Sequence, residues 1–245
     1  MHPRIAERIA KVADLSANAT VLEIGPGRGI LTRALLARAG RVIAVEADEA
    51  LYTTLQSDFA GDISSGRLEL IHGDIRAFDI GVLPRGYQLV ANIPYYLTGE
   101  IFRMFLESKN QPSSVTLLVQ KEVAVRIARS RKQSILSLSV KAYGTPKVIA
   151  KVRKPHFSPP PSVDSAILLI DNISRKFFAD ISEDNFFKVV RTGFASKRKM
   201  LVNNLLSLSQ KADVLHALNA CSIAKNTRAE KVSLEEWRCL TKRLS

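Results

Sequence analysis

Four consecutive residues, Asn92-Ile93-Pro94-Tyr95, carry the groups in this sequence that are best suited to chemistry. They follow the apolar run Tyr87–Ala91, which predicts a short buried strand, and open α/β sheets bind ligands just beyond the carboxyl ends of their strands. Asn92 offers a side-chain amide and Tyr95 a flat ring. Pro94 has no backbone N–H, but its carbonyl is a hydrogen-bond acceptor. These groups suit a flat ring with an exocyclic amine, which would stack on Tyr95 and donate to Asn92 and Pro94. The alternative is a strand-ending turn with a buried tyrosine.

The chain around this stretch alternates between short apolar strands and helical patterns. Apolar runs predict strands at Val21–Ile24, Arg41–Val45, Leu68–Ile71, Tyr87–Ala91 and Val115–Val119. Because helical patterns separate them, we expect a mostly parallel sheet covered by helices on both faces. Strands near 148–152 and 166–170 complete this part, and from about residue 175 the pattern is wholly helical. We therefore predict an α/β domain over residues 1–173 and a small all-helical domain over residues 174–245.

A glycine-rich turn follows the first strand. In Gly25-Pro26-Gly27-Arg28-Gly29 the backbone can approach a ligand closely, because glycine has no Cβ. Its third glycine comes one residue earlier than in the dinucleotide fingerprint, and Glu46 ends the next strand, where an acidic residue takes ribose hydroxyls. Asp74 ends the third strand and suits an adenine amine, while Glu23 precedes the turn and suits a cationic ligand. A nucleoside without a pyrophosphate fits this sheet edge better than NAD does.

The 245-residue chain has a formal net charge of +13 and an isoelectric point of about 10. This charge favours a polyanionic partner. The sequence has no apolar run of membrane-spanning length, no secretory signal pattern and no histidine spacing typical of a metal site. Cys221 and Cys239 have no CxxC partner, so we expect no structural zinc site, and nothing about them indicates an oxidising compartment.

Two further segments are suited to contact a nucleic acid. The stiff loop Pro155–Ser162 carries Phe157, which either stacks on the target ring opposite Tyr95 or fills the space under the loop. A basic cluster follows, on or beside a helix expected from residue 198 to residue 208, and this cluster favours phosphate groups over an ordinary solvated surface. Its members are Arg191, Lys197, Arg198 and Lys199.

These motifs together resemble one enzyme family. The resemblance rests on Val21–Gly29, Val45-Glu46, Gly73-Asp74, Asn92–Tyr95, Gln120–Ala124, Phe157–Ser165 and Gly193–Leu201. In combination they are similar to the ribosomal RNA adenine N6-dimethyltransferases, the KsgA family, which is related to the Erm methyltransferases. The resemblance covers nearly the whole chain. It implies a class I, Rossmann-like methyltransferase sheet that uses S-adenosylmethionine.

The family pattern implies a role for each site residue by its position. The methionine end of the cofactor is expected near Gly25, the ribose on Glu46 and the adenine near Asp74. The implied cofactor-binding set is Glu23, Gly25, Gly27, Glu46, Asp74, Ile75 and Asn92. The implied catalytic set is Asn92, Pro94 and Tyr95, and the implied RNA-contacting set is Tyr95, Phe157, Arg191, Lys197, Arg198 and Lys199. One departure stands out, because the family usually opens with a basic segment containing Gln-x-Phe-Leu, whereas this sequence begins Met1-His2-Pro3.

The resemblance also implies a reaction and a partner. We expect a cytoplasmic monomer, without a membrane partner, that dimethylates N6 of adjacent adenines near the 3′ end of small-subunit ribosomal RNA during ribosome biogenesis. One alternative is an Erm-like enzyme acting on large-subunit RNA, which the proline loop and the basic C-terminal segment disfavour. The other is a non-enzymatic RNA-binding paralogue in ribosome assembly or transcription, which the presence of Glu46, Asp74 and Asn92 disfavours.

Overall fold

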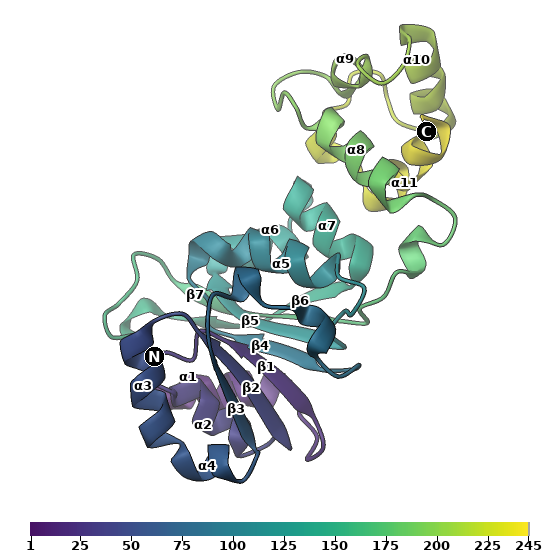
Figure 1. Cartoon of the computed structure of the whole chain (residues 1–245). Coiled ribbons are helices and arrows are strands. Elements are labelled where there is room, and N and C mark those ends of the chain that lie inside the picture. Colours follow the sequence, from purple (N-terminus) through teal and green to yellow (C-terminus); the bar gives the residue numbers. More distant parts are fainter. Residues whose placement is uncertain (245) are drawn as a thin grey trace. The chain divides into compact units, whose positions relative to one another are not determined.

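The computed structural model describes residues 1–244, and the chain divides into two compact units (Figure 1). The sheet unit contains residues 1–125 and 144–173, and the helical unit contains residues 126–143 and the chain from residue 174 onward. This division cuts the chain after residue 173, and it also groups residues 126–143 with the helices. Two hydrogen bonds account for this: the Tyr143 hydroxyl bonds Glu183, and the Gln133 N–H donates to the Glu230 carbonyl.

Seven strands form one sheet in the order β3-β2-β1-β4-β5-β7-β6. The first five are parallel, and β7 runs antiparallel to both of its neighbours, which confirms the expected mostly parallel α/β sheet. The strands are β1 Thr20–Ile24, β2 Arg41–Glu46, β3 Leu68–His72, β4 Gln88–Ala91, β5 Ser114–Gln120, β6 Thr145–Val152 and β7 Ser165–Asp171. Central strands such as β1 and β4 are almost continuously buried because helices cover both of their faces.

Helices α1 and α2 lie on one face of this sheet, and α5 and α6 lie on the other (Figure 1). The helices are α1 Pro3–Val12, α2 Ile30–Leu36, α3 Glu49–Asp58, α4 Ala60–Ser64, α5 Thr98–Leu106 and α6 Lys121–Ala128. In α1, Ile5 and Ile9 are one turn apart and buried against the sheet, as the helical spacing of apolar residues predicts. Short 3-10 turns lie in the loops after β3, β4 and β6: η1 Ile75–Ala77, η2 Ile80–Val82, η3 Tyr95–Leu97 and η4 Lys154–His156.

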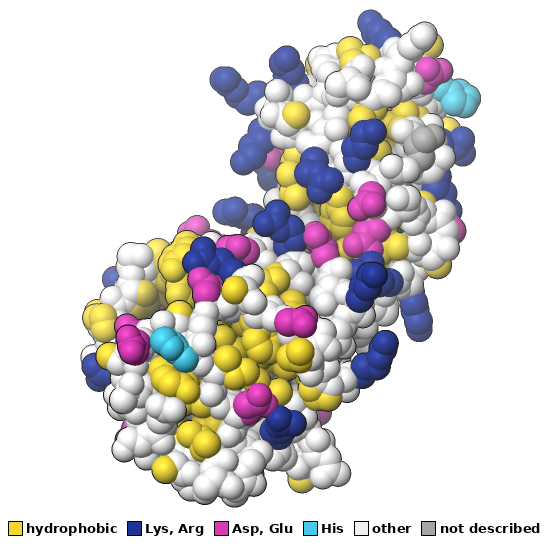
Figure 2. All heavy atoms as spheres, in the orientation of Figure 1, with side chains coloured by type: hydrophobic (Ala, Val, Ile, Leu, Met, Phe, Trp, Pro, Cys, Tyr) yellow, Lys and Arg dark blue, Asp and Glu magenta, His cyan; other side chains and the backbone are white. Residues whose placement is uncertain are grey.

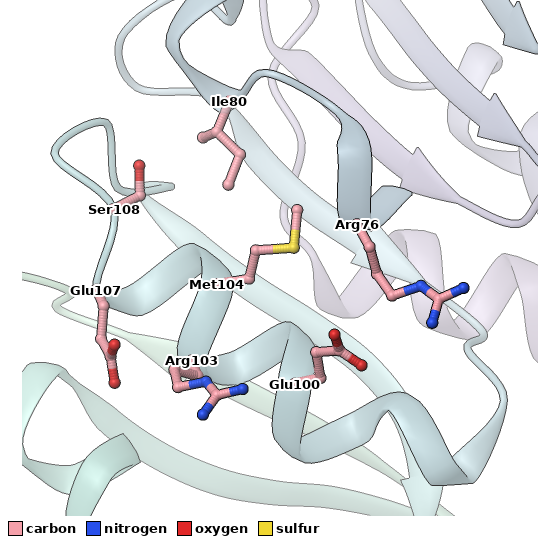
Figure 3. A pocket seen from close by; sticks show the side chains of 7 residues that line it. All are labelled: Arg76, Ile80, Glu100, Arg103, Met104, Glu107 and Ser108. Carbon is pink, nitrogen blue, oxygen red and sulfur yellow. The ribbon is translucent and has the colours of Figure 1, made fainter. Parts of the chain in front are cut away.

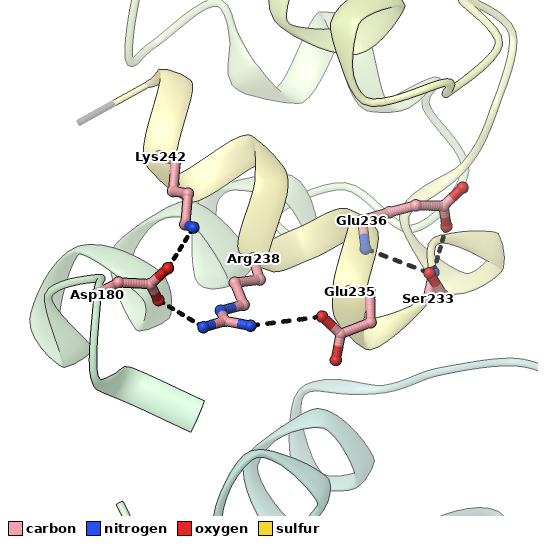
Figure 4. Close-up of polar contacts among 6 residues, drawn as sticks. All are labelled: Asp180, Ser233, Glu235, Glu236, Arg238 and Lys242. Atoms are coloured by element: carbon pink, nitrogen blue, oxygen red, sulfur yellow. Dashed lines mark hydrogen bonds and ion pairs between the residues drawn. The ribbon is translucent and has the colours of Figure 1, made fainter. Parts of the chain in front are cut away.

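The helical unit packs around aromatic side chains. Its helices are α7 Ile135–Tyr143, α8 Glu183–Gly193, α9 Leu201–Leu205, α10 Lys211–Ala220 and α11 Leu234–Arg243, with 3-10 turns η5 Lys176–Phe178 and η6 Ala229–Lys231. Trp237 and Phe186 are fully buried. Helix α11 begins with a capping box between Ser233 and Glu236, and Asp180 binds both Arg238 and Lys242 of this helix (Figure 4). Within residues 1–244, no helix is long and apolar enough to cross a membrane.

A disulfide bond joins Cys221, at the end of α10, to Cys239 in α11. Local patterns do not predict this pairing, because 18 residues separate the two cysteines. The chain reverses between α10 and α11 and brings the two thiols together. The sequence did not predict this bond, whereas the expectation about the compartment of the protein stays a prediction.

The helix expected over residues 198–208 is also wrong at its start. Helix α8 ends at Gly193, and Lys197, Arg198 and Lys199 lie in an irregular turn before α9. The last carbonyls of a helix need outside donors. The side-chain amide of Asn204 supplies a donor to the Gly193 carbonyl at the end of α8, and it also donates to the Ser196 carbonyl in the turn. This buried asparagine stabilises the turn that sequence periodicity read as helix.

We predict that Gly193→Ala destabilises the helical unit. A Cβ on Gly193 would lie 2.3 Å from the Trp237 ring and 2.9 Å from Leu201, so the buried indole must move. Overpacking of this kind costs about 1–3 kcal/mol. Urea unfolding of wild type and variant measures the reduction in stability.

Gly99→Ala is the matched control for this substitution. Gly99 lies in α5, and a Cβ there would meet nothing within 4 Å. The alanine should leave stability unchanged or raise it by up to about 1 kcal/mol, because alanine favours helix. Equal unfolding midpoints for the two variants would show that the Trp237 contact has no energetic consequence.

Candidate functional site

The register of the central strands brings the predicted site residues to one edge of the sheet. Ile24 at the end of β1 is paired with Val45 of β2 and with Ala91 of β4. The next residues along these three strands, Gly25, Glu46 and Asn92, therefore leave the sheet side by side. On the other side of β2, Glu46 is paired with His72, so the turn Gly73-Asp74 begins beside it.

The Glu46 carboxylate fastens the glycine-rich turn to the end of β2. Its Oε2 accepts from the Gly27 N–H at 2.9 Å, and its Oε1 accepts from the Asp48 N–H at 3.0 Å. The side chain is 6 % exposed, and each oxygen retains a lone pair for a further donor. Glu46 thus holds the turn in place and still has capacity for the ribose hydroxyls that the sequence assigns to it.

The three glycines of the turn have different roles. All three have positive φ, and a Cβ at Gly25 or Gly27 would meet nothing within 4 Å, so open space lies above their backbone. A Cβ at Gly29 would lie 2.4 Å from the Phe59 ring. Gly25 and Gly27 therefore form a cradle that a ligand can enter, whereas Gly29 allows close packing of α2 against Phe59.

A cavity of about 190 Å³ opens above this cradle. Its lining includes Glu23, Gly25, Gly27 and Asn92, four of the seven residues in the predicted cofactor-binding set, together with Ser158 of the proline loop. The remaining lining residues are Met1, Pro26, Arg28, Ile30 and Leu31. Ser158 carried no chemical signal in the sequence, and it reaches the cavity only because the proline loop folds back toward β1.

Glu23 is the most unusual group in this cavity. It is 1 % exposed, and neither of its carboxyl oxygens has a hydrogen-bond partner among the described residues. Burial raises the pKa of Glu23 to about 8; the nearby Thr32 hydroxyl opposes the rise, and the charge of Glu46 adds to it. A buried carboxyl without a partner costs free energy, and a ligand that brought a positive charge into the cavity would lower that cost.

The loop after β4 is held by bonds that the sequence did not reveal. Asn92 is half-buried in the cavity wall, and no hydrogen bond to its amide occurs within the described part of the chain. The Pro94 carbonyl is not free, since it accepts from the Leu97 N–H at 3.0 Å, but one lone pair remains. The Tyr95 hydroxyl lies 2.6 Å from the hydroxyl of buried Ser165 at the start of β7. These contacts fix the loop while leaving the Asn92 amide available.

Asp74 stands at the beginning of η1, where the adenine is expected. Its carboxylate accepts from the backbone N–H of Arg76 and binds the Arg76 guanidinium. The side-chain bond to Arg76, and then the backbone bond, lower the pKa of Asp74 to about 2. Ile75 beside it is 5 % exposed. Asp74 is therefore a carboxylate at neutral pH, and an adenine amine would share it with Arg76.

Phe157 lies partly buried against the apolar cluster formed by α1, α2 and the sheet. This position agrees with the alternative in which Phe157 fills the space under the proline loop. Stacking of Phe157 on a target base stays a prediction.

The whole chain matches the model of a known protein family. The family model for ribosomal RNA adenine dimethylase matches residues 1–245. The chain belongs to this family.

Individual relatives agree with the assignment. The chain is 42% identical over 243 residues to ribosomal RNA small subunit methyltransferase A of Dehalococcoides mccartyi, covering 96% of this chain and 82% of that protein. Its counterpart in Fusobacterium nucleatum is 38% identical over 243 residues, covering 95% of this chain and 89% of that protein. Among solved structures, the 23S rRNA methyltransferase ErmE superposes with a TM-score of 0.78 at 26% identity, covering 98% and 97% of the two chains. The expected class I methyltransferase fold with a helical C-terminal part is confirmed.

The basic residues of the chain are concentrated in one unit. The helical unit holds 19 Lys and Arg but only 7 Asp and Glu, which makes +12 of the net charge of +13. On the face in Figure 2, Lys and Arg side chains gather over this unit. Arg191, Lys197, Arg198 and Lys199 are all exposed. No group of three or more His, Cys, Asp or Glu within residues 1–244 is placed to hold a metal ion.

Sequence reasoning missed a second basic stretch, at the end of α6 and in the turn before α7. Arg126, Arg129, Arg131 and Lys132 belong to this stretch, which contains no acidic residue. Lys132 binds Glu230 of the helical unit at 3.1 Å. The run of like charges could have revealed this stretch in the sequence. Because it lies between two strands along the chain, however, the sequence did not show that it packs with the helices.

We predict that binding of S-adenosylmethionine ionises Glu23. At pH 7 a carboxyl with a pKa of about 8 is mainly protonated, and the ammonium and sulfonium groups of this cofactor favour the charged form. Binding at pH 7 should release about one proton and should tighten by up to tenfold per pH unit from about pH 6 toward pH 8. Calorimetry in two buffers with different ionisation enthalpies measures the released proton.

Glu23→Gln is the control for this prediction, because glutamine has the same shape and cannot ionise. The variant should bind the cofactor about 1.5–3 kcal/mol more weakly and should not release the proton. Equal proton release by the two proteins at pH 7 would mean that another group titrates and that Glu23 does not face the cofactor.

Proposed function

We propose that this chain transfers methyl groups from S-adenosylmethionine to N6 of adenines near the 3′ end of small-subunit ribosomal RNA. The observation that carries the proposal is the position of Asn92-Ile93-Pro94-Tyr95 beside the buried, unpartnered Glu23 carboxyl. A cation-accepting cavity and an amine-accepting loop thus meet at one sheet edge. Curated relatives at 36% to 43% identity carry the name ribosomal RNA small subunit methyltransferase A, which agrees with this substrate.

The residues at the sheet edge fit the two ends of the cofactor. Glu23 and the Gly25–Gly27 backbone would hold the methionine end, Glu46 the ribose, and Asp74 with Ile75 the adenine. The fit rests on the orphaned Glu23 oxygens, on the open space over the glycines and on the ionised Asp74. When bound, S-adenosylmethionine supplies an electrophilic methyl group.

The loop after β4 would orient the target amine. The Asn92 side-chain oxygen and the second lone pair of the Pro94 carbonyl accept its two N–H groups, and Tyr95 contacts the ring. This holds the nitrogen lone pair toward the cavity that Asn92 and Glu23 share, and such positioning accounts for large rate effects. Methylation makes the nitrogen cationic and its proton acidic, so the proton can leave to solvent without a dedicated base. The target adenine must be unpaired or flipped out to reach the loop.

The helical unit would supply most of the RNA affinity. A surface with +12 charge releases counterions when it meets phosphates, and this term dominates nonspecific RNA binding. We assign this role to Arg191, Lys197, Arg198 and Lys199, which the sequence singled out, and extend it to residues 126–132. The protein would act as a cytoplasmic monomer on the small ribosomal subunit.

Methylation assays on separated ribosomal particles test the proposed function. The purified protein is incubated with S-adenosylmethionine and with small-subunit or large-subunit particles that lack adenine methylation. Mass spectrometry of the nucleosides should show dimethyladenosine in the small subunit. Product in the large subunit instead would favour the Erm-like alternative, and RNA binding without product would favour the non-enzymatic one.

We predict that Asn92→Ala abolishes turnover while cofactor binding stays mostly intact. The amide contacts the substrate amine in the transition state, so kcat and kcat/KM should fall together, by about 100-fold or more. Single-turnover kinetics on small-subunit particles and calorimetry with the cofactor measure the two effects. Near-normal methyl transfer by the folded variant would refute the assigned role of Asn92.

We predict that replacing Lys197 and Arg198 together by Gln weakens RNA binding and flattens its salt dependence. The slope of log K against log salt should fall by roughly one for each phosphate group that the variant no longer neutralises. Cofactor affinity should not change, because the cofactor residues all belong to the sheet unit. Binding measured over a series of salt concentrations gives the slope.

The double variant Arg38→Gln/Arg85→Gln is the matched control. Both arginines are exposed residues of the sheet unit, and their replacement lowers the net charge by the same two units. A smaller effect than that of the Lys197/Arg198 variant locates the phosphate site. Identical salt slopes for the two double variants would show that only the overall charge matters.

A further inference from the structure

The 3-10 turn after the reactive loop presents a second aromatic ring. Tyr96 follows Tyr95 directly, and its side chain is 83% exposed, more than any other exposed large hydrophobic of the described residues. Single exposed apolar residues are common on protein surfaces. Its position makes Tyr96 different, because four residues of chain place it within about 14 Å of Asn92.

The backbone under Tyr96 is fixed. The Leu97 N–H donates to the Pro94 carbonyl at 3.0 Å, and the Thr98 hydroxyl donates to the Tyr95 carbonyl at 2.9 Å. The Tyr95 ring is tied to Ser165 of β7, so the two tyrosines have opposite environments. Tyr95 is held at the sheet edge, whereas Tyr96 offers its ring to solvent from a rigid turn. A ring presented in this way loses little conformational entropy when a flat partner stacks on it.

Positive charge lies next to this ring. Arg76 of η1 lies near Tyr96, and its guanidinium is bound to the Asp74 carboxylate. Arg76 and Arg103 also line a cavity of about 440 Å³ between η1 and α5, and Figure 3 shows their guanidinium groups with Glu100 between them. Glu100 and Glu107 make the lining mixed in charge, and Met104 and Ile80 add apolar surface. Such a surface suits a nucleotide, with its base, sugar hydroxyls and phosphate, better than a bare anion.

We propose that Tyr96 is a stacking platform for the unpaired nucleotide that flanks the target adenine. The inference rests on the proposed function, since it assumes an RNA strand whose target base enters at Asn92. The neighbouring base would stack on Tyr96 while Arg76 and Arg103 lie beside its backbone. Every base has a flat face, and stacking on an aromatic side chain is a sequence-tolerant way to hold single-stranded nucleic acid. Tyr96 would thereby keep the strand splayed, so that one base at a time reaches Asn92.

A set of variants and modified RNAs tests this proposal. Unpaired RNA oligonucleotides that contain the target adenine are compared with versions in which the base on either side is replaced by an abasic site. Affinity is measured by fluorescence anisotropy for wild type, Tyr96→Ala, Tyr96→Trp and the control Ile149→Ala, which removes a half-exposed apolar side chain of β6. Cofactor affinity checks that each variant is folded.

Stacking predicts a specific pattern of affinities. Tyr96→Ala should weaken binding of the intact RNA by about tenfold, whereas Tyr96→Trp and Ile149→Ala should bind like wild type. Removal of one flanking base should cost wild type a similar factor and cost Tyr96→Ala nothing, because the two changes remove the same stacking interaction. An equal abasic penalty in both proteins, or wild-type affinity of Tyr96→Ala for intact RNA, would overturn the proposal.

The two kinds of measurement separate this inference from the proposed function. If wild type methylates small-subunit RNA and Tyr96→Ala does so with unchanged KM and affinity, only the stacking platform fails. If wild type transfers no methyl group to any particle, the proposed function fails, and the binding pattern with abasic RNA still decides whether Tyr96 stacks on a flanking base.

Discussion

The alignment of three parallel strands is the constraint on which the site depends. Because β1 is in register with both β2 and β4, the residues that follow Ile24, Val45 and Ala91 leave the sheet at the same level. Side chains that are far apart in the sequence, such as Glu46 and Asn92, thereby share one edge. The Glu46 carboxylate then locks the arrangement, since it bonds the Gly27 N–H and the Asp48 N–H. The positions of the site residues thus depend on the backbone hydrogen bonds of the central sheet.

The buried Glu23 carboxyl shows how stability and binding oppose each other at this edge. Its folded-state pKa is raised above the unfolded value of 4.5, so the stability it contributes is fully present below about pH 4.5 and is lost as the pH rises through about 8. A core residue without charge would avoid this loss. The protein retains a group that is costly in the empty protein and that a cationic ligand would stabilise, which is the pattern expected of a functional site.

The two units differ in net charge and in the role that we propose for each. The sheet unit is nearly neutral overall and carries the groups that would read the cofactor and the target amine. The helical unit carries nearly all the excess positive charge, on a surface held by a core of aromatic residues and by pairs such as Asp180 with Arg238. Electrostatic attraction to RNA is long-ranged and tolerant of sequence, whereas the orientation of one amine requires fixed short-range contacts.

Much of this protein follows from the sequence by itself. Runs such as Val21–Ile24 form strands, and helical patterns separate them. Right-handed crossovers bring the polar strand ends together at one edge of the sheet. The fold and the residues at that edge could therefore be predicted from local sequence patterns. The tertiary structure alone decided how those residues are held. Ser165 reaches Tyr95 across 70 residues, Asn204 ends α8 before the basic turn, and residues 126–143 join the helices. The burial of Glu23, with Thr32 of α2 beside it, likewise arises only in the folded chain. Propensity and periodicity are properties of neighbouring residues, but desolvation and side-chain capping depend on atoms that only folding brings into contact.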